Sequence, residues 1–503
     1  MKRASTVGEL RRSGYRVLSV KGEMRKNLIE NMRNGKKLFP GIIGYERTVI
    51  PAIINAILAK HDIILLGLRG QAKSRILRML PNFLDEWIPI IKGSEINDNP
   101  FHPVSKHAVD LLAECGDATE IEWIPREARY GEKLATPDVT IADLIGDIDP
   151  IKAASQRLHY SHEGAIHFGI IPRTNRGIFA INELPDLQPR IQVSLFNIME
   201  EKDIQIRGFN IRIPLDIMIV FTANPEDYTN RGNIVTPLKD RIDSQILTHY
   251  PRTMEDAIKI TAQEACINRD GLEVRIPHYF TEIVEQVAFE ARKSEFVDQK
   301  SGVSARLSIA SMEILVSNAE QRTILTGEKY VTPRICDLVG TLPGITGKIE
   351  LVFEGEQEGS VKVSRALIGK AVREVFKKYF PDPLQKRVRD YQESRPEPPD
   401  PEYGKILTWF EAGNKIEVSD QMNADRYFRE LDKVKGLREL TKKHMKIPEE
   451  NKEEFASAME FVLDGLHQNS KIAKDEVNQA TAYKDLVSSI FLQKGKSGPE
   501  EDY

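Results

Sequence analysis

A glycine-rich segment between positions 67 and 74 has the composition of a phosphate-binding loop. It reads Gly-Leu-Arg-Gly-Gln-Ala-Lys-Ser and follows a short apolar run, Ile63–Leu66, that is typical of a strand buried on both faces. In such a loop, backbone N–H groups and the start of the next helix face the phosphates. Lys73 would contact the β and γ oxygens, and the Ser74 hydroxyl would join the Mg²⁺ shell. The segment therefore predicts a site for ATP and Mg²⁺. The predicted nucleotide-binding residues are Gly67, Gly70, Gln71, Ala72, Lys73, Ser74 and Arg75.

Alanine stands at position 72, where the strict form of this loop has a second glycine. We therefore expect the backbone at Ala72 to avoid conformations that are open only to glycine. The alternative interpretation of the whole segment is a glycine-rich turn before a helix that binds no ligand.

Two polar residues, Asn182 and Glu183, follow the second apolar run, Ile178–Ile181. Parallel strands present their carboxyl ends to the ligand crevice, so both side chains should stand near the nucleotide. A carboxylate there can orient the attacking water and accept its proton, and we predict that Glu183 is the catalytic base. Asn182 is the predicted second metal ligand beside Ser74. Because an amide carries no charge for a hard cation, metal affinity or turnover should suffer.

Three other residues have types suited to phosphate chemistry. Asn224 follows the third apolar run, Ile217–Phe221, and could hydrogen-bond the γ-phosphate or the attacking water. The alternative is that Asn224-Pro225 forms a turn. Arg241 follows a polar loop and Arg306 begins a predicted helix. Each arginine, taken alone, is typical of a solvated or salt-bridged side chain.

The elements that must position these residues alternate between strand and helix. A helical pattern covers Val49–Leu58 and another covers Ile191–Glu200, and apolar residues around Gly208 predict a hairpin over Asp203–Ile213. Strands that alternate with helices predict an α/β fold with a parallel sheet flanked by helices.

The rest of the chain divides by composition. A proline-dense stretch over 381–402 predicts an extended linker, and residues 350–353 are a possible strand within a mainly helical region. The predicted domains are a basic helical segment 1–37, a nucleotide-binding α/β domain 38–251, a mainly helical lid 252–380, the linker 381–402, and a C-terminal helical region 403–503 with a frayed tail.

Composition excludes several classes of protein. The net charge of −4 over 503 residues does not indicate a nucleic-acid-binding protein, and the basic start of the chain is more typical of a solvated amphipathic helix. No apolar run approaches the roughly 20 residues that span a bilayer, and no signal core precedes the first domain, so we expect no membrane insertion and a cytoplasmic location. Cys115, Cys266 and Cys336 form no metal-binding pair.

Three histidines, His159, His162 and His167, lie in one short stretch. In a hairpin their spacing places neighbouring histidines on opposite faces. Glu163 is the only other metal-ligand residue type nearby, so we do not predict a metal site there.

Taken in order, these segments resemble the AAA+ superfamily, and within it the branch of the MoxR ATPases and the magnesium-chelatase ATPase subunit. Phe39–Glu46, which includes Ile43, resembles the segment that contacts adenine. The glycine-rich loop 67–74 resembles Walker A, and alanine before the lysine is familiar in this branch. Gly177–Leu187 resembles Walker B, and Thr222–Pro225 resembles sensor 1. Asn182 departs from the family pattern, and the resemblance covers about residues 38–379.

The resemblance also implies roles for residues between and after these motifs. Gln156–Ile171 would be the helix-2 insert, and 189–201 would lead to the second hairpin that faces a partner. Arg241 falls at the arginine finger, which serves the ATP of the neighbouring subunit, and Arg306 at sensor 2, which serves the subunit's own ATP. A finger supplied by a neighbour couples hydrolysis to assembly, so the resemblance implies a ring, commonly a hexamer.

Several hypotheses for function remain open on this basis. The leading one is an ATPase ring that remodels or activates a protein partner, such as a protein with a von Willebrand A-type domain. A second is a nucleotide-gated scaffold with little hydrolysis because of Asn182. A third is the ATPase subunit of a metal chelatase. A transcription activator of the enhancer-binding type would need a Gly-Ala-Phe-Thr-Gly-Ala loop, which the sequence lacks.

Overall fold

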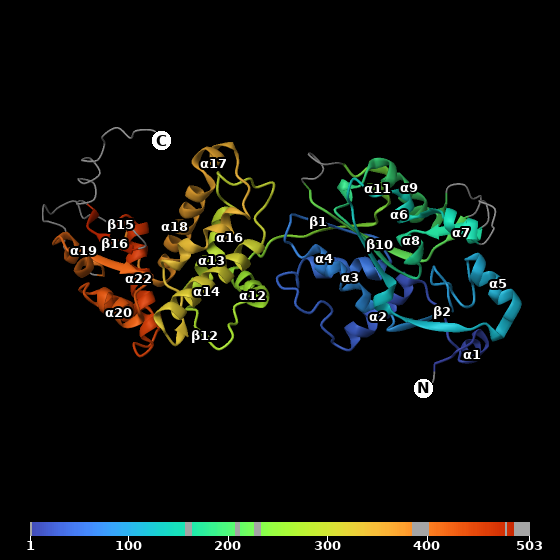
Figure 1. Ribbon diagram of the computed structural model, residues 1–503, viewed down its shortest axis with the longest axis horizontal. Coiled ribbons are helices and arrows are strands. Elements are labelled where there is room, and N and C mark those ends of the chain that lie inside the picture. The colour runs from blue at the N-terminus through green and yellow to red at the C-terminus, as the bar shows by residue number, and fades with distance from the viewer. Residues whose placement is uncertain are drawn as a thin grey trace. The chain divides into compact units, whose positions relative to one another are not determined.

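The computed structural model of the chain describes residues 3–155, 163–206, 212–225, 233–384, 402–477 and 480–486. The chain forms two compact units, residues 1–250 and residues 251–503 (Figure 1). We call them unit 1 and unit 2. The division lies beside the boundary predicted at residue 251, and each unit is described by itself.

Unit 1 is built on a five-stranded parallel sheet in the order β11-β1-β10-β7-β4. Its strands are β1 (Ile63–Leu66), β4 (Tyr130–Leu134), β7 (Gly177–Asn182), β10 (Ile217–Ala223) and β11 (Ser244–Leu247). The three predicted central strands are confirmed as β1, β7 and β10. All their residues are buried, which explains why their sequences are continuously apolar rather than alternating.

Helices cover both faces of this sheet, as Figure 1 shows. One apolar core joins the sheet to α2 (Val20–Arg33), α3 (Val49–Ala59) and α4 (Lys73–Leu77). The other core joins the opposite face to α6 (Ile141–Leu144), α8 (Ile170–Arg173), α9 (Pro189–Glu200) and α11 (Thr236–Arg241). Along β1, Ile63 and Leu65 face the first core, and Ile64 and Leu66 face the second. The predicted α/β fold with flanking helices is therefore confirmed.

The basic start of the chain belongs to unit 1 and does not stand apart from it. It contains α1 (Val7–Arg12) and α2, and three apolar residues of α2, Val20, Met24 and Leu28, enter the core against α3. Glu23 of the same helix forms a two-bond ion pair with Arg129, at 2.7 Å for each N–O distance. These two side chains are only 5% and 1% exposed, so α2 is anchored as firmly as an internal helix.

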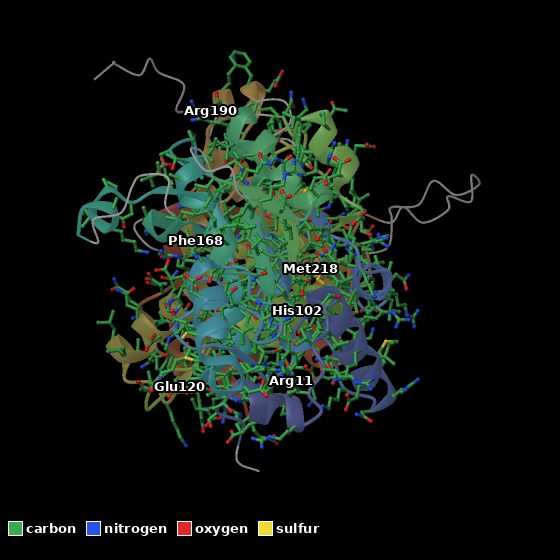
Figure 2. The ribbon with its side chains drawn as sticks, turned by 90° about the vertical axis from the view of Figure 1, so that its right-hand side faces the viewer. Arg11, His102, Glu120, Phe168, Arg190 and Met218 are labelled. Carbon is green, nitrogen blue, oxygen red and sulfur yellow. The ribbon has the colours of Figure 1, made fainter. Side chains whose placement is uncertain are left out.

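A small hairpin subdomain lies between α4 and β4. Strands β2 (Trp87–Ile91) and β3 (Ile121–Pro125) pair antiparallel, and α5 (Lys106–Cys115) connects them. The N-terminal α1 packs on this hairpin through a small apolar cluster. In Figure 2, Arg11 and Glu120 lie in the lower part of the view and Arg190 of α9 lies at the top.

Two further hairpins lie where the sequence predicts partner-facing insertions. Strands β5 (Gly146–Ile148) and β6 (Ile166–Phe168) pair antiparallel beside α7 (Pro150–Ser155). Strands β8 (Asp203–Gln205) and β9 (Arg212–Pro214) pair antiparallel after α9, which confirms the predicted hairpin over its described residues. Residues 156–162 and 207–211 lie outside the described residues.

Unit 2 is mainly helical and has one apolar core, which runs from the predicted lid into the C-terminal region. Within it the Tyr279 ring stacks on Phe461 and Phe376 meets Phe461 edge to face, and the three residues come from helices far apart in the sequence. The helices are α12 (Met254–Glu264), α13 (His278–Ala291), α14 (Arg306–Thr326), α15 (Asp337–Gly340), α16 (Leu342–Thr346), α17 (Phe353–Glu358), α18 (Ser360–Tyr379), α19 (Gly404–Glu411), α20 (Ala424–Asp432), α21 (Leu437–His444) and α22 (Lys452–Gln468).

Two features of unit 2 differ from the sequence-based expectation. The C-terminal region contains a three-stranded antiparallel sheet in the order β14-β16-β15 in addition to its helices, formed by β14 (Ile416–Ser419), β15 (Ala473–Val477) and β16 (Ala480–Lys484). The possible strand over 350–353 is wrong, because Leu351 makes only an isolated bridge with Val297 and α17 begins at Phe353. A short parallel pair, β12 (Glu273–Val274) with β13 (Tyr330–Val331), was also not predicted. Most of the predicted linker, residues 385–401, lies outside the described residues.

Within the described parts of the chain, no helix combines the length and the apolar content that a bilayer-spanning segment needs.

The buried Glu23–Arg129 pair gives a stability test. Arg129→Met removes one partner and leaves a buried, unpaired carboxylate, so we expect the free energy of unfolding of unit 1 to fall by about 3–5 kcal/mol. The measurement is urea unfolding followed by tryptophan fluorescence in a Trp409→Phe background, since the two remaining tryptophans, Trp87 and Trp123, both lie in unit 1.

Arg11→Met is the matched control for this test. Arg11 pairs with Asp117, but both side chains are more than half exposed, so its loss should cost at most about 1 kcal/mol. Equal effects of the two substitutions would contradict the anchoring role of the buried pair.

Candidate functional site

Polar side chains gather at the carboxyl ends of three neighbouring strands of unit 1. The loop after β1 carries Lys73 and Ser74, the end of β7 carries Asn182 and Glu183, and Asn224 follows β10. Because β1, β10 and β7 are adjacent and parallel, their ends meet at one edge of the sheet. The structure therefore brings five of the predicted site residues together.

The glycine-rich loop is held in place from outside by two hydroxyl groups. Thr248 donates its hydroxyl to the side-chain oxygen of Gln71 at 2.6 Å, and Tyr45 donates its hydroxyl to the Gln71 carbonyl at 3.0 Å. Burial raises the pKa of Tyr45 to about 12, which keeps this hydroxyl protonated and able to donate. Ile43 lies two residues before Tyr45 and is half-buried, so the predicted adenine segment adjoins the loop.

The backbone of the loop uses the left-handed region twice. Gly70 has a φ of 74° and Ala72 has a φ of 56° with a ψ of 16°. Ala72 thus lies in a region that glycine favours but that is not open only to glycine, since Lys60 and Glu183 also adopt it. A left-handed alanine costs roughly 1–2 kcal/mol, and such strain is found mostly where the surrounding structure imposes it for function. The helix that follows, α4, is only five residues long, so the loop and Lys73 must provide most of any phosphate contact.

Lys73 is almost fully buried, with 6% of its surface exposed. Its ammonium donates to the carbonyls of Gly67 and Leu68 and, at 2.6 Å, to the side-chain oxygen of Asn224. A buried charge requires such partners, and the loop supplies them from its own backbone. The ammonium is thus fixed inside the curve of the loop.

Asn224 connects Lys73 to Glu183. Its side-chain nitrogen donates to a carboxylate oxygen of Glu183 at 2.9 Å, while its oxygen accepts from Lys73. An ammonium can only donate and a carboxylate can only accept, so this orientation of the amide is required. Glu183 itself has a φ of 56°, and its backbone N–H donates to the hydroxyl of Thr222 at 3.1 Å.

Asn182 and Ser74 are the two predicted metal ligands, and the structure brings their oxygens close together. The Ser74 hydroxyl donates to the side-chain oxygen of Asn182 at 3.4 Å, and the Thr222 hydroxyl donates to the same oxygen at 3.2 Å. Mg²⁺ prefers oxygen ligands in a small, regular shell, so these two oxygens fit it in chemical type. Neither carries a charge.

Glu132 is a neighbour of this site that sequence reasoning missed. It lies on β4 at the edge of the sheet and accepts a hydrogen bond from the side-chain nitrogen of Asn182 at 2.5 Å. Burial by itself raises the pKa of Glu132, but hydrogen bonds from Arg78 and Asn182 outweigh it and hold the pKa below its usual range. The carboxylate is therefore ionised beside the predicted metal ligands.

The other predicted site residues lie elsewhere. Arg75 is exposed on α4. Arg241 ends α11, where its guanidinium donates to Glu200 at 2.8 Å and to the Pro237 carbonyl at 2.9 Å. Arg306 is the first residue of α14 and belongs to unit 2.

The stretch that contains the three histidines lies partly outside the described residues. His159 and His162 lie outside the described residues, and His167 lies on β6. Among the residues that the structure does describe, no group of three or more histidine, cysteine, aspartate or glutamate side chains could hold a metal ion.

Comparison with known proteins gives partial matches. No family model matches the chain. It is 28% identical to an archaeal Lon protease of Thermococcus kodakarensis over 210 residues, which is 37% of this chain and 31% of that protein. It is 22% identical to the chaperone MoxR1 of Mycobacterium tuberculosis over 228 residues, which is 42% of this chain and 57% of that protein. The chain thus spans well under two thirds of the length of either relative.

A solved structure of the complex between subunits BchI and BchD of magnesium chelatase is 20% identical. The match covers 64% of this chain and 98% of that one with a TM-score of 0.34.

Together, the fold and the site define a P-loop arrangement, with a parallel sheet flanked by helices and a glycine-rich loop between β1 and α4. Within this class, the order of the motifs and the similarity to MoxR1 support the resemblance to the MoxR and magnesium-chelatase branch of the AAA+ ATPases.

Gly67 gives a direct test of how tightly the loop is packed. A Cβ atom at Gly67 would lie 1.9 Å from the Thr248 hydroxyl and 2.2 Å from the Gln71 side-chain oxygen. We expect Gly67→Ala to lower the free energy of unfolding of unit 1 by about 1–3 kcal/mol, because neighbouring atoms must move. Urea unfolding of Gly67→Ala, Thr248→Ala and the double variant measures this. Removal of the hydroxyl should recover part of the loss, and strictly additive effects would contradict the predicted clash.

Proposed function

We propose that this chain binds ATP with Mg²⁺ at the loop between β1 and α4, hydrolyses it, and uses the cycle to remodel or activate a protein partner. The observation that carries the proposal is the connected chain Lys73, Asn224 and Glu183 at the ends of adjacent parallel strands. It links the phosphate-contacting cation to a candidate base through one amide. A glycine-rich turn without a ligand would have no need of this arrangement.

Lys73 is the residue that would bind the phosphates. Its three N–H groups are engaged by two loop carbonyls and Asn224, and phosphate oxygens are stronger acceptors because they are charged. Exchange of one or more of these acceptors for phosphate oxygens would bind the nucleotide. Where Asn224 is the acceptor replaced, its side chain would be released from Lys73.

Glu183 is the residue that would activate water. Its carboxylate can accept the proton of the attacking water, while Asn224, which donates to that carboxylate, can orient it. Both act through positioning, which supplies most of the catalysis in phosphoryl transfer. Ser74 and Asn182 would hold the Mg²⁺ ion that accompanies ATP, and a bound Mg²⁺ neutralises charge on the phosphate oxygens.

Arg241 is proposed to serve the ATP of a neighbouring subunit. In the single chain its guanidinium is occupied by Glu200 and lies 5.1 Å from the centre of the Phe196 ring. Glu200 is 57% exposed, and ion pairs of this kind contribute only about 0–1 kcal/mol, so Arg241 can leave Glu200 at little cost. A ring of six subunits, a cytoplasmic location and a partner with a von Willebrand A-type domain are proposals from the family resemblance.

Two alternatives use the same nucleotide site. In a nucleotide-gated scaffold, ATP holds the assembly together and turnover is slow because Asn182 lacks a charge. In a metal chelatase complex, the ATPase cycle would drive metal insertion on other subunits. The scaffold differs from our proposal in its slow ATP turnover. The chelatase complex differs from it in the partner on which the cycle acts.

Substitution of Glu183 tests the proposed base. We expect Glu183→Gln to lower the ATP hydrolysis rate by about 10²–10⁴-fold, because the amide cannot accept the proton, while the affinity for a fluorescent ATP analogue stays unchanged. The measurements are steady-state phosphate release and fluorescence titration. Glu201→Gln, on an exposed glutamate after α9, is the control and should behave as wild type. Nucleotide binding without turnover in the wild type would favour the scaffold instead.

Mixing of two inactive variants tests the shared site. Arg241→Ala should hydrolyse ATP slowly because it lacks the finger, and Glu183→Gln because it lacks the base. A subunit with intact Glu183 beside one with intact Arg241 forms a complete site, so an equal mixture should recover up to about a quarter of the wild-type rate.

The matched control for the mixing test is Arg190→Ala, at an exposed arginine on α9, which should keep full activity alone. Failure of the mixture to recover activity, with subunit exchange shown by native mass spectrometry, would contradict the finger role of Arg241.

A further inference from the structure

A negatively charged residue, Glu132, lies beside the candidate metal ligands on a neighbouring strand. Asn182 ends β7 and is neutral, while Glu132 lies on β4, which pairs parallel with β7 in a register that sets Leu134 opposite Asn182. The Glu132 carboxylate reaches the Asn182 amide and accepts its N–H at 2.5 Å. A charge is thus one hydrogen bond away from the oxygen that faces Ser74.

This hydrogen bond determines which atom of Asn182 faces Ser74. The amide nitrogen points to Glu132, so the amide oxygen points to the hydroxyls of Ser74 and Thr222. The reverse orientation would set the amide oxygen against the carboxylate and give the N–H groups no anionic acceptor. Glu132 therefore keeps the oxygen, which is the only part of an amide that can bind a cation, on the Ser74 side.

Arg78 holds Glu132 in this position. Its guanidinium donates to the two carboxylate oxygens at 2.8 Å and 3.1 Å. Arg78 directly follows α4, so the same short segment carries Lys73, Ser74 and the residue that orients Glu132. The guanidinium is 65% exposed and the carboxylate 21%, so the pair contributes little to stability. Its effect is on geometry, since a two-bond pair fixes the carboxylate in one plane.

We propose that Glu132, held by Arg78, is a positioning residue that keeps the Asn182 oxygen on the Ser74 side and polarises it towards Mg²⁺. The inference rests on the proposed function. A carboxylate hydrogen-bonded to a ligand fixes its orientation and makes its oxygen a better donor, and loss of such a partner typically costs 10- to 100-fold in metal affinity. Asn182 and Glu132 form a matched pair, because an aspartate at 182 would set two carboxylates against each other.

The test measures metal affinity rather than activity. The full chain is saturated with the non-hydrolysable analogue AMP-PNP, and Mn²⁺ is titrated with free Mn²⁺ followed by electron paramagnetic resonance. We expect Glu132→Gln to weaken Mn²⁺ binding by about 10- to 100-fold. Arg78→Met should weaken it less, because the carboxylate remains but is less well oriented. Glu120→Gln, which removes an exposed, ion-paired carboxylate of the same unit, is the control and should match wild type.

Moving the carboxylate from position 132 to position 182 tests whether its loss in Glu132→Gln explains the weaker Mn²⁺ binding. Asn182→Asp alone should not strengthen Mn²⁺ binding, since Glu132 then faces a like charge. The double variant Asn182→Asp with Glu132→Gln moves the charge onto β7 and should bind Mn²⁺ within a few fold of wild type. Unchanged binding in Glu132→Gln, or tighter binding in Asn182→Asp alone, would overturn the inference.

Nucleotide affinity measured without metal separates a failure of the proposed ATP site from a failure of the proposed role of Glu132. Titration of a fluorescent ATP analogue in the presence of EDTA should give the same affinity for wild type and Glu132→Gln, which also shows that the variant is folded. If the wild type binds no nucleotide under either condition, both the proposed function and this inference are overturned. If nucleotide binds but Mn²⁺ affinity does not depend on Glu132, only the inference is wrong.

Discussion

The buried ammonium of Lys73 is the constraint on which the rest of the site depends. A cation that is removed from water must be surrounded by acceptors, and here they are two loop carbonyls and the Asn224 side chain. The first two require the loop to curve back on itself, which the left-handed backbone at Gly70 and Ala72 allows. The third requires β10 to lie beside β1 in parallel register. The sheet order, the strained loop and the position of Glu183 are therefore all linked to the need to surround the Lys73 ammonium with acceptors.

Most of the site was predictable because its residues follow strands that are buried on both faces. β1, β7 and β10 are continuous apolar runs, so the residue after each strand could be assigned to the same sheet edge without knowledge of the strand order. Edge strands do not have this signature. β4 reads Tyr-Gly-Glu-Lys-Leu and is only half-buried, so neither the strand nor Glu132 stood out. The signal that could have revealed Glu132 is the buried Asn182 itself, because its side-chain N–H groups need a hydrogen-bond acceptor.

Other differences between sequence and structure also have physical causes. The sheet β14-β16-β15 was missed because its strands are short and lie among strongly amphipathic helices whose period dominates the sequence. We expected a separate basic segment over residues 1–37 because the composition of a segment shows its charge but does not show which of its residues are buried. In the structure α2 buries Val20, Met24 and Leu28 in the core. Most of its lysines and arginines lie on its exposed face, and these are the residues that suggested a solvated helix.

The position of the negative charge also bears on the choice between a motor and a scaffold. Asn182, considered alone, favours a scaffold, since a neutral ligand binds Mg²⁺ weakly. Asn182 hydrogen-bonded to an ionised Glu132 does not, because a carboxylate that is itself paired with Arg78 then stands one hydrogen bond away from the ligand oxygen. A more distant charge attracts the cation less strongly. Such a site would hold the cation less tightly than one with a direct carboxylate ligand, which agrees with the turnover that we propose.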